Sequence, residues 1–184
     1  MDYPLHGITA CQLGLVVRDI DKAVQEHSEV YGIKQWFRVN IQSIEYYYQG
    51  QREHLVLDIV MGYCKGTQIE LIQVLEGERN IYVDLLLKEN LIHSGVSVRD
   101  FDNKIAALKQ RGYKELHHGT FRSKGLSTVR MAYFDCRKEL GYILEILEVK
   151  CLGINLGMPK FLLQAGRLTG DASLYKPRQS ITTL

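Results

Sequence analysis

The sequence lacks the features that mark several large classes of protein. No apolar run approaches the roughly 18 residues that a membrane helix requires, and no charged-then-apolar signal opens the chain. No C-x-x-C pair is present, which argues against a zinc knuckle or a redox centre. We interpret the four widely separated cysteines as reduced thiols of a cytoplasmic protein: Cys11, Cys64, Cys136 and Cys151.

Strong charge of either sign is also absent. The 184 residues carry 23 basic and 21 acidic side chains, a formal net charge of +2, so no bulk attraction to nucleic acid is expected. Basic residues do concentrate in the second half, where we expect a solvated face and keep a phosphate-bearing ligand, such as coenzyme A near Arg122, as the alternative. These residues are Lys109, Arg111, Lys114, Arg122, Lys124 and Arg130.

What the sequence does contain is an internal repeat. The stretch from Gln12 to Val24, QLGLVVRDIDKAV, recurs as HSGVSVRDFDNKI from His93 to Ile105. Glycine, valine, arginine and two aspartates recur in register at an offset of 81 residues, from position 12 to position 93. An offset this long is not a solenoid period and indicates one duplicated module.

A second, shorter repeat lies near the end of each half of the sequence. Gly66-Thr-Gln-Ile-Glu70 is answered by Gly141-Tyr-Ile-Leu-Glu145, and each glutamate lies in an otherwise apolar run. The pattern predicts strand, helix, strand, strand, strand in each copy. We therefore expect a first module over 1–76, a linker over 77–91 with a helical turn at 84–88, a second module over 92–150, and a C-terminal extension over 151–184.

Local signals place several elements. Asp19 is a plausible N-cap and Gly32 a plausible end for the first helix, and Asp100 and Gly112 bound the second. Strands are predicted at 35–41, 55–63, 67–75, 92–98, 113–116, 127–134 and 142–149, with a loose turn after Tyr46–Tyr48. His117 and His118 are predicted in an exposed, turn-like break. Trp36 and the three tyrosines are expected in the core rather than in a pocket.

Four repeat-equivalent positions could form a site. Gln12 and His93 open the first strand of each module, while Glu70 and Glu145 lie in the last strands. A buried carboxylate costs several kcal/mol unless it is compensated, so each glutamate faces either solvent or a cation. One amide, one imidazole and two carboxylates suit a divalent cation such as Zn, Ni, Co, Mn or Mg.

The tandem modules, the x-x-G-[LV]-x-V-R-D-[IF]-D openings and the late G-x-x-x-E resemble the vicinal oxygen chelate superfamily, in its glyoxalase and methylmalonyl-CoA epimerase-like branch. The resemblance covers roughly residues 11–150. It implies an α+β fold in which two tandem βαβββ modules pair into a cupped, half-open β-barrel. It also implies a homodimer and a metal held by Gln12, Glu70, His93 and Glu145. Gln12 replaces the histidine that is common in epimerases, although some glyoxalase I enzymes have glutamine there.

The chemistry implied by this resemblance is proton abstraction beside a carbonyl of a small-molecule substrate, with the enolate stabilised by the cation. Glu145 is the expected base and Glu70 its partner on the opposite face of the substrate carbon. An iron dioxygenase is less expected, because it needs two histidines and one carboxylate.

Two other functions remain open. One is a non-catalytic binding or resistance protein of the same fold; the other, ranked last, is a metal-dependent transferase acting on an antibiotic such as fosfomycin. The internal repeat does not continue beyond Lys150. The apolar segment around Met158 is expected to cover the sheet or a partner subunit and to end in a mobile tail.

Overall fold

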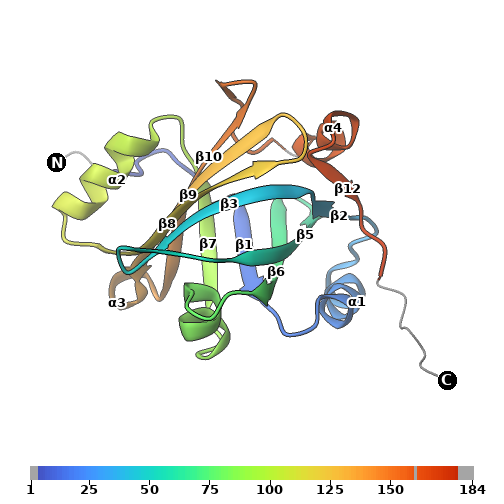
Figure 1. Cartoon of the computed structure of the whole chain (residues 1–184), viewed down its shortest axis with the longest axis horizontal. Helices are drawn as coiled ribbons and strands as arrows, with labels where there is room; N and C mark the ends of the chain where they lie inside the picture. The colour runs from blue at the N-terminus through green and yellow to red at the C-terminus, as the bar shows by residue number, and fades with distance from the viewer. Residues whose placement is uncertain (1–3, 160, 178–184) are drawn as a thin grey trace.

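The computed structural model describes residues 4–159 and 161–177 (Figure 1), and these residues form one twelve-stranded sheet with helices on its outside. The first repeat unit comprises β1 (Gln12–Val16), α1 (Ile20–Tyr31), β2 (Trp36–Val39), β5 (Val56–Cys64) and β6 (Thr67–Glu76). The second comprises β7 (Ile92–Ser97), α2 (Phe101–Gln110), β8 (Lys114–Ser123), β9 (Ser127–Cys136), α3 (Arg137–Leu140) and β10 (Tyr142–Cys151).

The two units repeat the same strand order. The first runs β2-β5-β6-β1 and the second β8-β9-β10-β7, and they meet where β1 pairs antiparallel with β7. In each unit the first strand pairs parallel with the last. The predicted α+β fold with two paired βαβββ modules is confirmed, whereas the domain boundaries stay predictions.

A hairpin that the sequence did not predict curls the sheet. β3 (Ile41–Tyr48) and β4 (Gln51–Glu53) pair with each other, and β3 also pairs with β8 of the second unit. Only Asn40 separates β2 from β3, yet the two strands lie near opposite ends of the strand order. The sheet must therefore curl until its two ends approach, and it forms the expected half-barrel (Figure 1). The loose turn predicted after Tyr48 is the tight β3–β4 connection.

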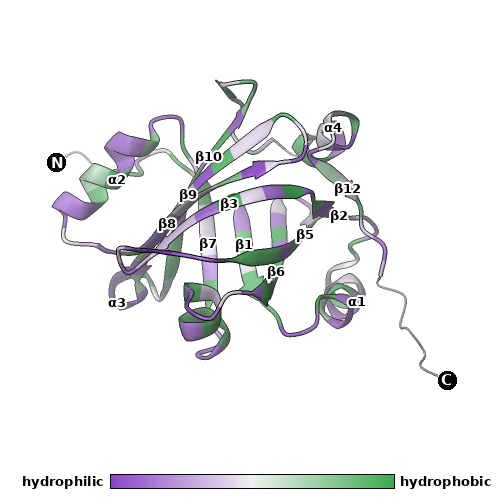
Figure 2. Cartoon of the chain, viewed as in Figure 1, coloured by the Kyte–Doolittle hydropathy of each residue, from purple (hydrophilic) through white to green (hydrophobic). Residues whose placement is uncertain are grey.

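Helix α1 begins and ends where the sequence predicts. The Asp19 carboxylate accepts a hydrogen bond from the backbone N–H of Lys22, and Gly32 takes the left-handed conformation at φ 67°. The buried residues Ile20, Ala23 and Val24 pack on the outer face of the sheet. Both α1 and α2 carry many hydrophilic residues, whereas β5 is largely hydrophobic (Figure 2). Asp100 makes no side-chain cap on α2.

The main core lies inside the curl. Strand β5 shows how alternation divides the layers, because Ile59 and Met61 face the interior while Val60 packs under α1. The short π-helix η1 (Tyr82–Leu87) adds Tyr82 and Leu86 to the inner core. It lies two residues earlier than the turn expected at 84–88.

His117 corrects a prediction. Strand β8 runs through both histidines without a break, so successive side chains alternate and only His118 is exposed. The ring of His117 is buried beside Tyr46, Tyr82 and Tyr133. Tyr46 and Tyr48 are buried as expected, and Tyr47 is half-buried. Trp36 lies in the core under α1.

The C-terminal extension folds back onto its own sheet. It contains β11 (Ile154–Asn155), which pairs with β10, helix α4 (Leu162–Thr169), and β12 (Ala172–Leu174), which pairs with β2. Asp171 fastens it to the β8–β9 turn, accepting hydrogen bonds from the Ser123 hydroxyl and from the backbone N–H groups of Leu126 and Ser127. The tail predicted to be mobile reaches into 178–184, outside the described residues. No described helix is long and apolar enough to cross a membrane.

Candidate metal centre

The four repeat-equivalent side chains lie on four adjacent strands at the middle of the sheet. Glu70 is on β6, Gln12 on β1, His93 on β7 and Glu145 on β10, and these strands are consecutive in the sheet. Gly14 is in register with both Glu70 and His93, and Gly95 is in register with both Gln12 and Glu145. The duplication therefore places the four residues around the junction of the two units.

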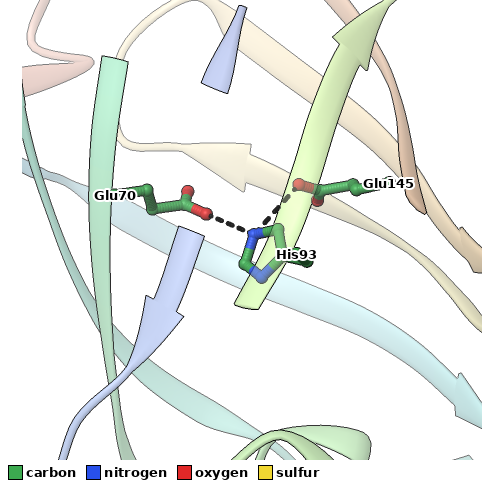
Figure 3. Close-up of side chains that lie close together, drawn as sticks. All are labelled: Glu70, His93 and Glu145. Carbon is green, nitrogen blue, oxygen red and sulfur yellow. Dashed lines mark hydrogen bonds and ion pairs between the residues drawn. The ribbon is translucent and has the colours of Figure 1, made fainter. Parts of the chain in front are cut away.

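Three of these side chains converge inside the barrel. The Nε2 atom of His93 lies 3.1 Å from Oε2 of Glu70 and 3.3 Å from Oε2 of Glu145. One ligand atom from each residue lies within 4.8 Å of the other two. Figure 3 shows both carboxylates pointing at the imidazole from opposite sides. The exposed fractions are 0% for His93, 5% for Glu70 and 3% for Glu145, so the group is shielded from water.

Two glycines make this convergence possible. The ring of His93 lies over Gly14, and the side-chain oxygen of Gln12 lies over Gly95. A Cβ atom at position 95 would stand 2.5 Å from that oxygen, too close for any side chain. The recurring pattern of a polar residue, any residue and glycine thus has a steric reason, because each copy makes room for the side chain of the other.

Gln12 is oriented by a short chain of amides. Its Nε2 donates a hydrogen bond to Oε1 of Gln68 at 3.1 Å, and Nε2 of Gln68 donates to the hydroxyl of Tyr63 at 2.9 Å. These bonds leave Oε1 of Gln12 buried without a hydrogen-bond partner in the described chain. A buried carbonyl oxygen without a donor is unusual in proteins and suits coordination to a cation.

The buried group combines two acidic side chains with one imidazole, so its charges do not cancel. Burial raises the pKa of Glu70, although its hydrogen bond from His93 acts the other way. Burial lowers the pKa of His93, but interactions with Glu145 and Glu70 outweigh it and raise that pKa to about 9. A single imidazolium is thus held between two carboxylates, and within the described residues no other cation forms an ion pair with either of them.

These residues fit a divalent cation. Two carboxylates, one imidazole and an unpartnered amide oxygen form a mixed oxygen and nitrogen donor set. A bound dication would replace the proton on His93 and offset the two buried negative charges, which one imidazolium cannot do fully.

A second layer of aromatic residues, which the sequence analysis did not single out, surrounds the centre. Tyr133 is directly opposite Glu145 in the β9–β10 register, and its hydroxyl lies 3.4 Å from Nε2 of His93. Its ring packs against those of Tyr82 and His117. The alternation along 127–134 placed Tyr133 on one face of a strand, but only the register with β10 shows that this face meets Glu145.

A cavity opens beside the carboxylates. Near the centre its walls include Gln12, Glu70, Tyr133 and Glu145, and further away they are mainly apolar up to a polar group around Asp171 at the far end. The strands of both repeat units and the C-terminal extension supply the apolar wall. A metal bound at the four residues would therefore face a largely apolar space.

A curled sheet built from two βαβββ units, with a buried carboxylate, imidazole and carboxylate at their junction, defines a class of protein. The model of the Glyoxalase/Bleomycin resistance protein/Dioxygenase superfamily matches residues 11–133. The chain belongs to this superfamily, as the repeat predicted. The matched segment contains Gln12, Glu70 and His93 and ends before Glu145.

Solved structures agree on the fold. Methylmalonyl-CoA epimerase from Mycobacterium tuberculosis is 16% identical, with a TM-score of 0.51 over 80% of this chain and 90% of that chain. A hypothetical protein from Bacillus halodurans is 15% identical, with a TM-score of 0.53 over 78% of this chain and 96% of that chain. At such low identity the likeness concerns the fold alone. A search of curated proteins finds no match.

Proposed function

We propose that the protein is a metal-dependent lyase or isomerase, glyoxalase-like or epimerase-like, that removes a proton next to a carbonyl of a small molecule. One observation carries the proposal: two buried carboxylates from equivalent strands converge on His93 beside a cavity. Two acids on either side of a bound carbon can take a proton from one face and return one to the same or the other face. The similarity to an epimerase structure supports the fold only.

Gln12, Glu70, His93 and Glu145 would hold the metal. A divalent cation there would supply Lewis-acid stabilisation of the negative charge that develops on the substrate oxygen. The three side chains His93, Glu70 and Glu145 are buried, and charge interactions are stronger in a site shielded from water. The hydroxyl of Tyr133 is close enough to the centre to donate a hydrogen bond to a substrate oxygen.

Glu145 is the better candidate for the base. Its Oε2 atom makes only a 3.3 Å ion pair with Nε2 of His93, whereas Oε2 of Glu70 accepts a shorter hydrogen bond from the same nitrogen at 3.1 Å. The freer carboxylate can move toward the substrate with less loss of bonding. Glu70 then handles the proton on the opposite face.

The test combines metal analysis with solvent-deuterium exchange. Purified protein is loaded with each candidate metal and screened against α-hydroxyketones, hemithioacetals and 2-substituted acyl thioesters. Glu145→Gln should abolish the exchange, while Gln12→Ala should mainly weaken metal binding. Glu148→Gln is the matched control, because Glu148 lies on the same strand but pairs with Lys150 and Arg130 on the other face.

The alternative is a non-catalytic small-molecule binding or resistance protein, and the apolar cavity supports it. A full metal complement without exchange on any substrate class would favour this alternative. A homodimer and a cytoplasmic location also stay proposals. Light scattering of the purified protein measures the first.

A further inference from the structure

The cavity beside the metal centre follows the β9–β10 ladder away from Glu145. Inward-facing residue pairs line it at four successive steps of two residues, and each step advances about 7 Å. The lined length is therefore about 20 Å. The pairs are Glu145 with Tyr133, Leu147 with Met131, Val149 with Val129, and Cys151 with Ser127. Ionisable carboxylates stand at the first step, and the next two are wholly aliphatic.

The far wall comes from the C-terminal extension. Leu156, Met158, Leu162 and Leu163 line the cavity, and Leu163 is buried in the main core. These residues lie outside the segment that matches the superfamily model, which ends at 133. Helix α4 and β12 lie together beside β2 in Figure 1, so the extension closes the side of the barrel that the repeat units leave open.

Cationic side chains are absent from the cavity wall as far as the described residues define it. Strand β8 shows why, because Phe121 and Ser123 face the cavity while Arg122 between them is exposed on the outer face. Arg130 likewise points outward to Asp102 and Glu148. The phosphate-binding alternative raised by the basic residues thus has no support within the cavity.

The one carboxylate at the far end is already satisfied. Asp171 accepts hydrogen bonds from the hydroxyls of Ser123 and Thr169 and from two backbone N–H groups. These four bonds occupy its oxygens, so a ligand that reaches this end would have to displace one of them to bind the carboxylate directly. An ionised group of either sign placed among Leu147, Val149 and Leu163 would be buried without a partner, which is strongly unfavourable.

We propose that the cavity takes an uncharged ligand with two neighbouring oxygens at one end and an apolar tail along β9 and β10, and that the extension selects the tail. The oxygen-bearing head rests on the proposed function, because it presumes a metal at Glu70, His93 and Glu145. The apolar tail rests only on the cavity. Acyl thioesters with an ionised distal portion are excluded by the same reasoning.

The experiment compares two compounds that differ only at the distal end. Calorimetry measures binding of 1-(4-butylphenyl)propane-1,2-dione and of its analogue with a terminal carboxylate in place of the butyl methyl group to the metal-loaded protein. The butyl compound should bind at least about tenfold more tightly, since the cavity offers no partner for the carboxylate. Equal or tighter binding of the carboxylate overturns the inference, and so does failure of both compounds to bind.

Variants of α4 test the role of the extension. Leu163→Lys should weaken binding of the butyl compound by at least about tenfold, because it places a cation in the apolar wall. It should also reduce or reverse the preference for the butyl compound over the carboxylate. Leu168→Lys is the control, since Leu168 lies on the same helix but is 91% exposed. Leu162→Lys, at a half-buried lining position, serves if Leu163→Lys fails to fold. An unchanged preference in a folded lining variant overturns the role of the extension.

The outcomes separate this inference from the proposed function. If no substrate shows deuterium exchange but the butyl preference persists, the proposed catalytic function is wrong and the inference of an apolar-tailed ligand is supported. If exchange occurs with acyl thioesters that carry a distal charge and the butyl preference is absent, the proposed function is supported and the inference about the apolar tail is wrong.

Discussion

The ring of His93 occupies the space that a side chain at position 14 would fill. A Cβ atom on Gly14 would stand 1.9 Å from Nε2 of His93, because the two residues are direct partners on β1 and β7. The same imidazole nitrogen faces both carboxylates. The geometry of the proposed metal centre is therefore set by strand pairing and by a missing side chain as much as by Glu70, His93 and Glu145 themselves.

Gly14→Ala should displace the imidazole and weaken metal binding by about 10- to 100-fold, the usual range for residues that orient a ligand. Backbone conformation is no obstacle, because Gly14 is not among the residues with positive φ. Calorimetric titration with zinc measures the affinity, and circular dichroism checks folding. Ser94→Ala, next to His93 on β7, is the control. An affinity within twofold of the unaltered protein would contradict the steric argument.

Glu145→Gln should change the stability of the metal-free protein and its metal affinity in opposite directions. Without metal, the substitution removes one of two carboxylates that share a single imidazolium, so we expect the free energy of unfolding to rise by about 1–3 kcal/mol. Metal affinity should fall in the same variant. Urea unfolding with and without metal measures both effects.

Glu148→Gln should behave in the opposite way. Glu148 is buried but lies 2.8 Å from the Lys150 ammonium, so its loss leaves a cation without its partner and lowers stability. Metal affinity should not change. Destabilisation of the metal-free protein by Glu145→Gln would show that this carboxylate is structural.

His117→Phe should improve stability in acid. Burial lowers the pKa of His117 to about 3, so the folded state keeps the ring neutral while the unfolded chain takes up a proton near pH 6.5. Above about pH 6.5 His117 does not lower the free energy of unfolding. As the pH falls toward 3 this free energy decreases, by up to about 2 kcal/mol between pH 7 and 5. Both ring nitrogens lack partners in the described chain, so phenylalanine sacrifices no hydrogen bond.

Urea unfolding at pH 7 and pH 5 measures this loss in the protein and in the variant. His118→Phe is the control, because its ring is exposed and pairs with Glu115. We expect only His117→Phe to reduce the difference between the two pH values. Equal differences in all three proteins would mean that His117 titrates normally in the fold.

Asp171→Ala should loosen the C-terminal extension. The substitution leaves the N–H groups of Leu126 and Ser127 without an acceptor, and it should cost about 2–3 kcal/mol, as for hydrogen bonds to a charged group. Hydrogen exchange should speed up in α4 more than in β9 or β10. Ser173→Ala, which removes one exposed hydrogen bond to Asn40, is the control. Uniform exchange throughout the chain would contradict an anchoring role.

Local features of the sequence determined local features of the fold. Asp19 and Gly32 bound α1 because capping depends on residues within one helical turn. The internal repeat went further, since two copies of one unit must place Glu70 and Glu145 in equivalent strands. With both first strands at the junction, Gln12 and His93 had to meet them there.

The tertiary structure alone decided the rest. Pairing of β3 with β8 joins residues that are 69 positions apart at Tyr48 and His117 and 82 apart at Ile41 and Ser123, and neither strand carries a pattern that identifies its partner. The burial of His117 beside Tyr46 depends on that pairing, the contact of Tyr133 with His93 depends on the register of β9, β10 and β7, and the wall formed by Leu163 depends on the docking of the extension. Periodicity shows which side chains share a face, but only the packing of distant strands settles what that face meets.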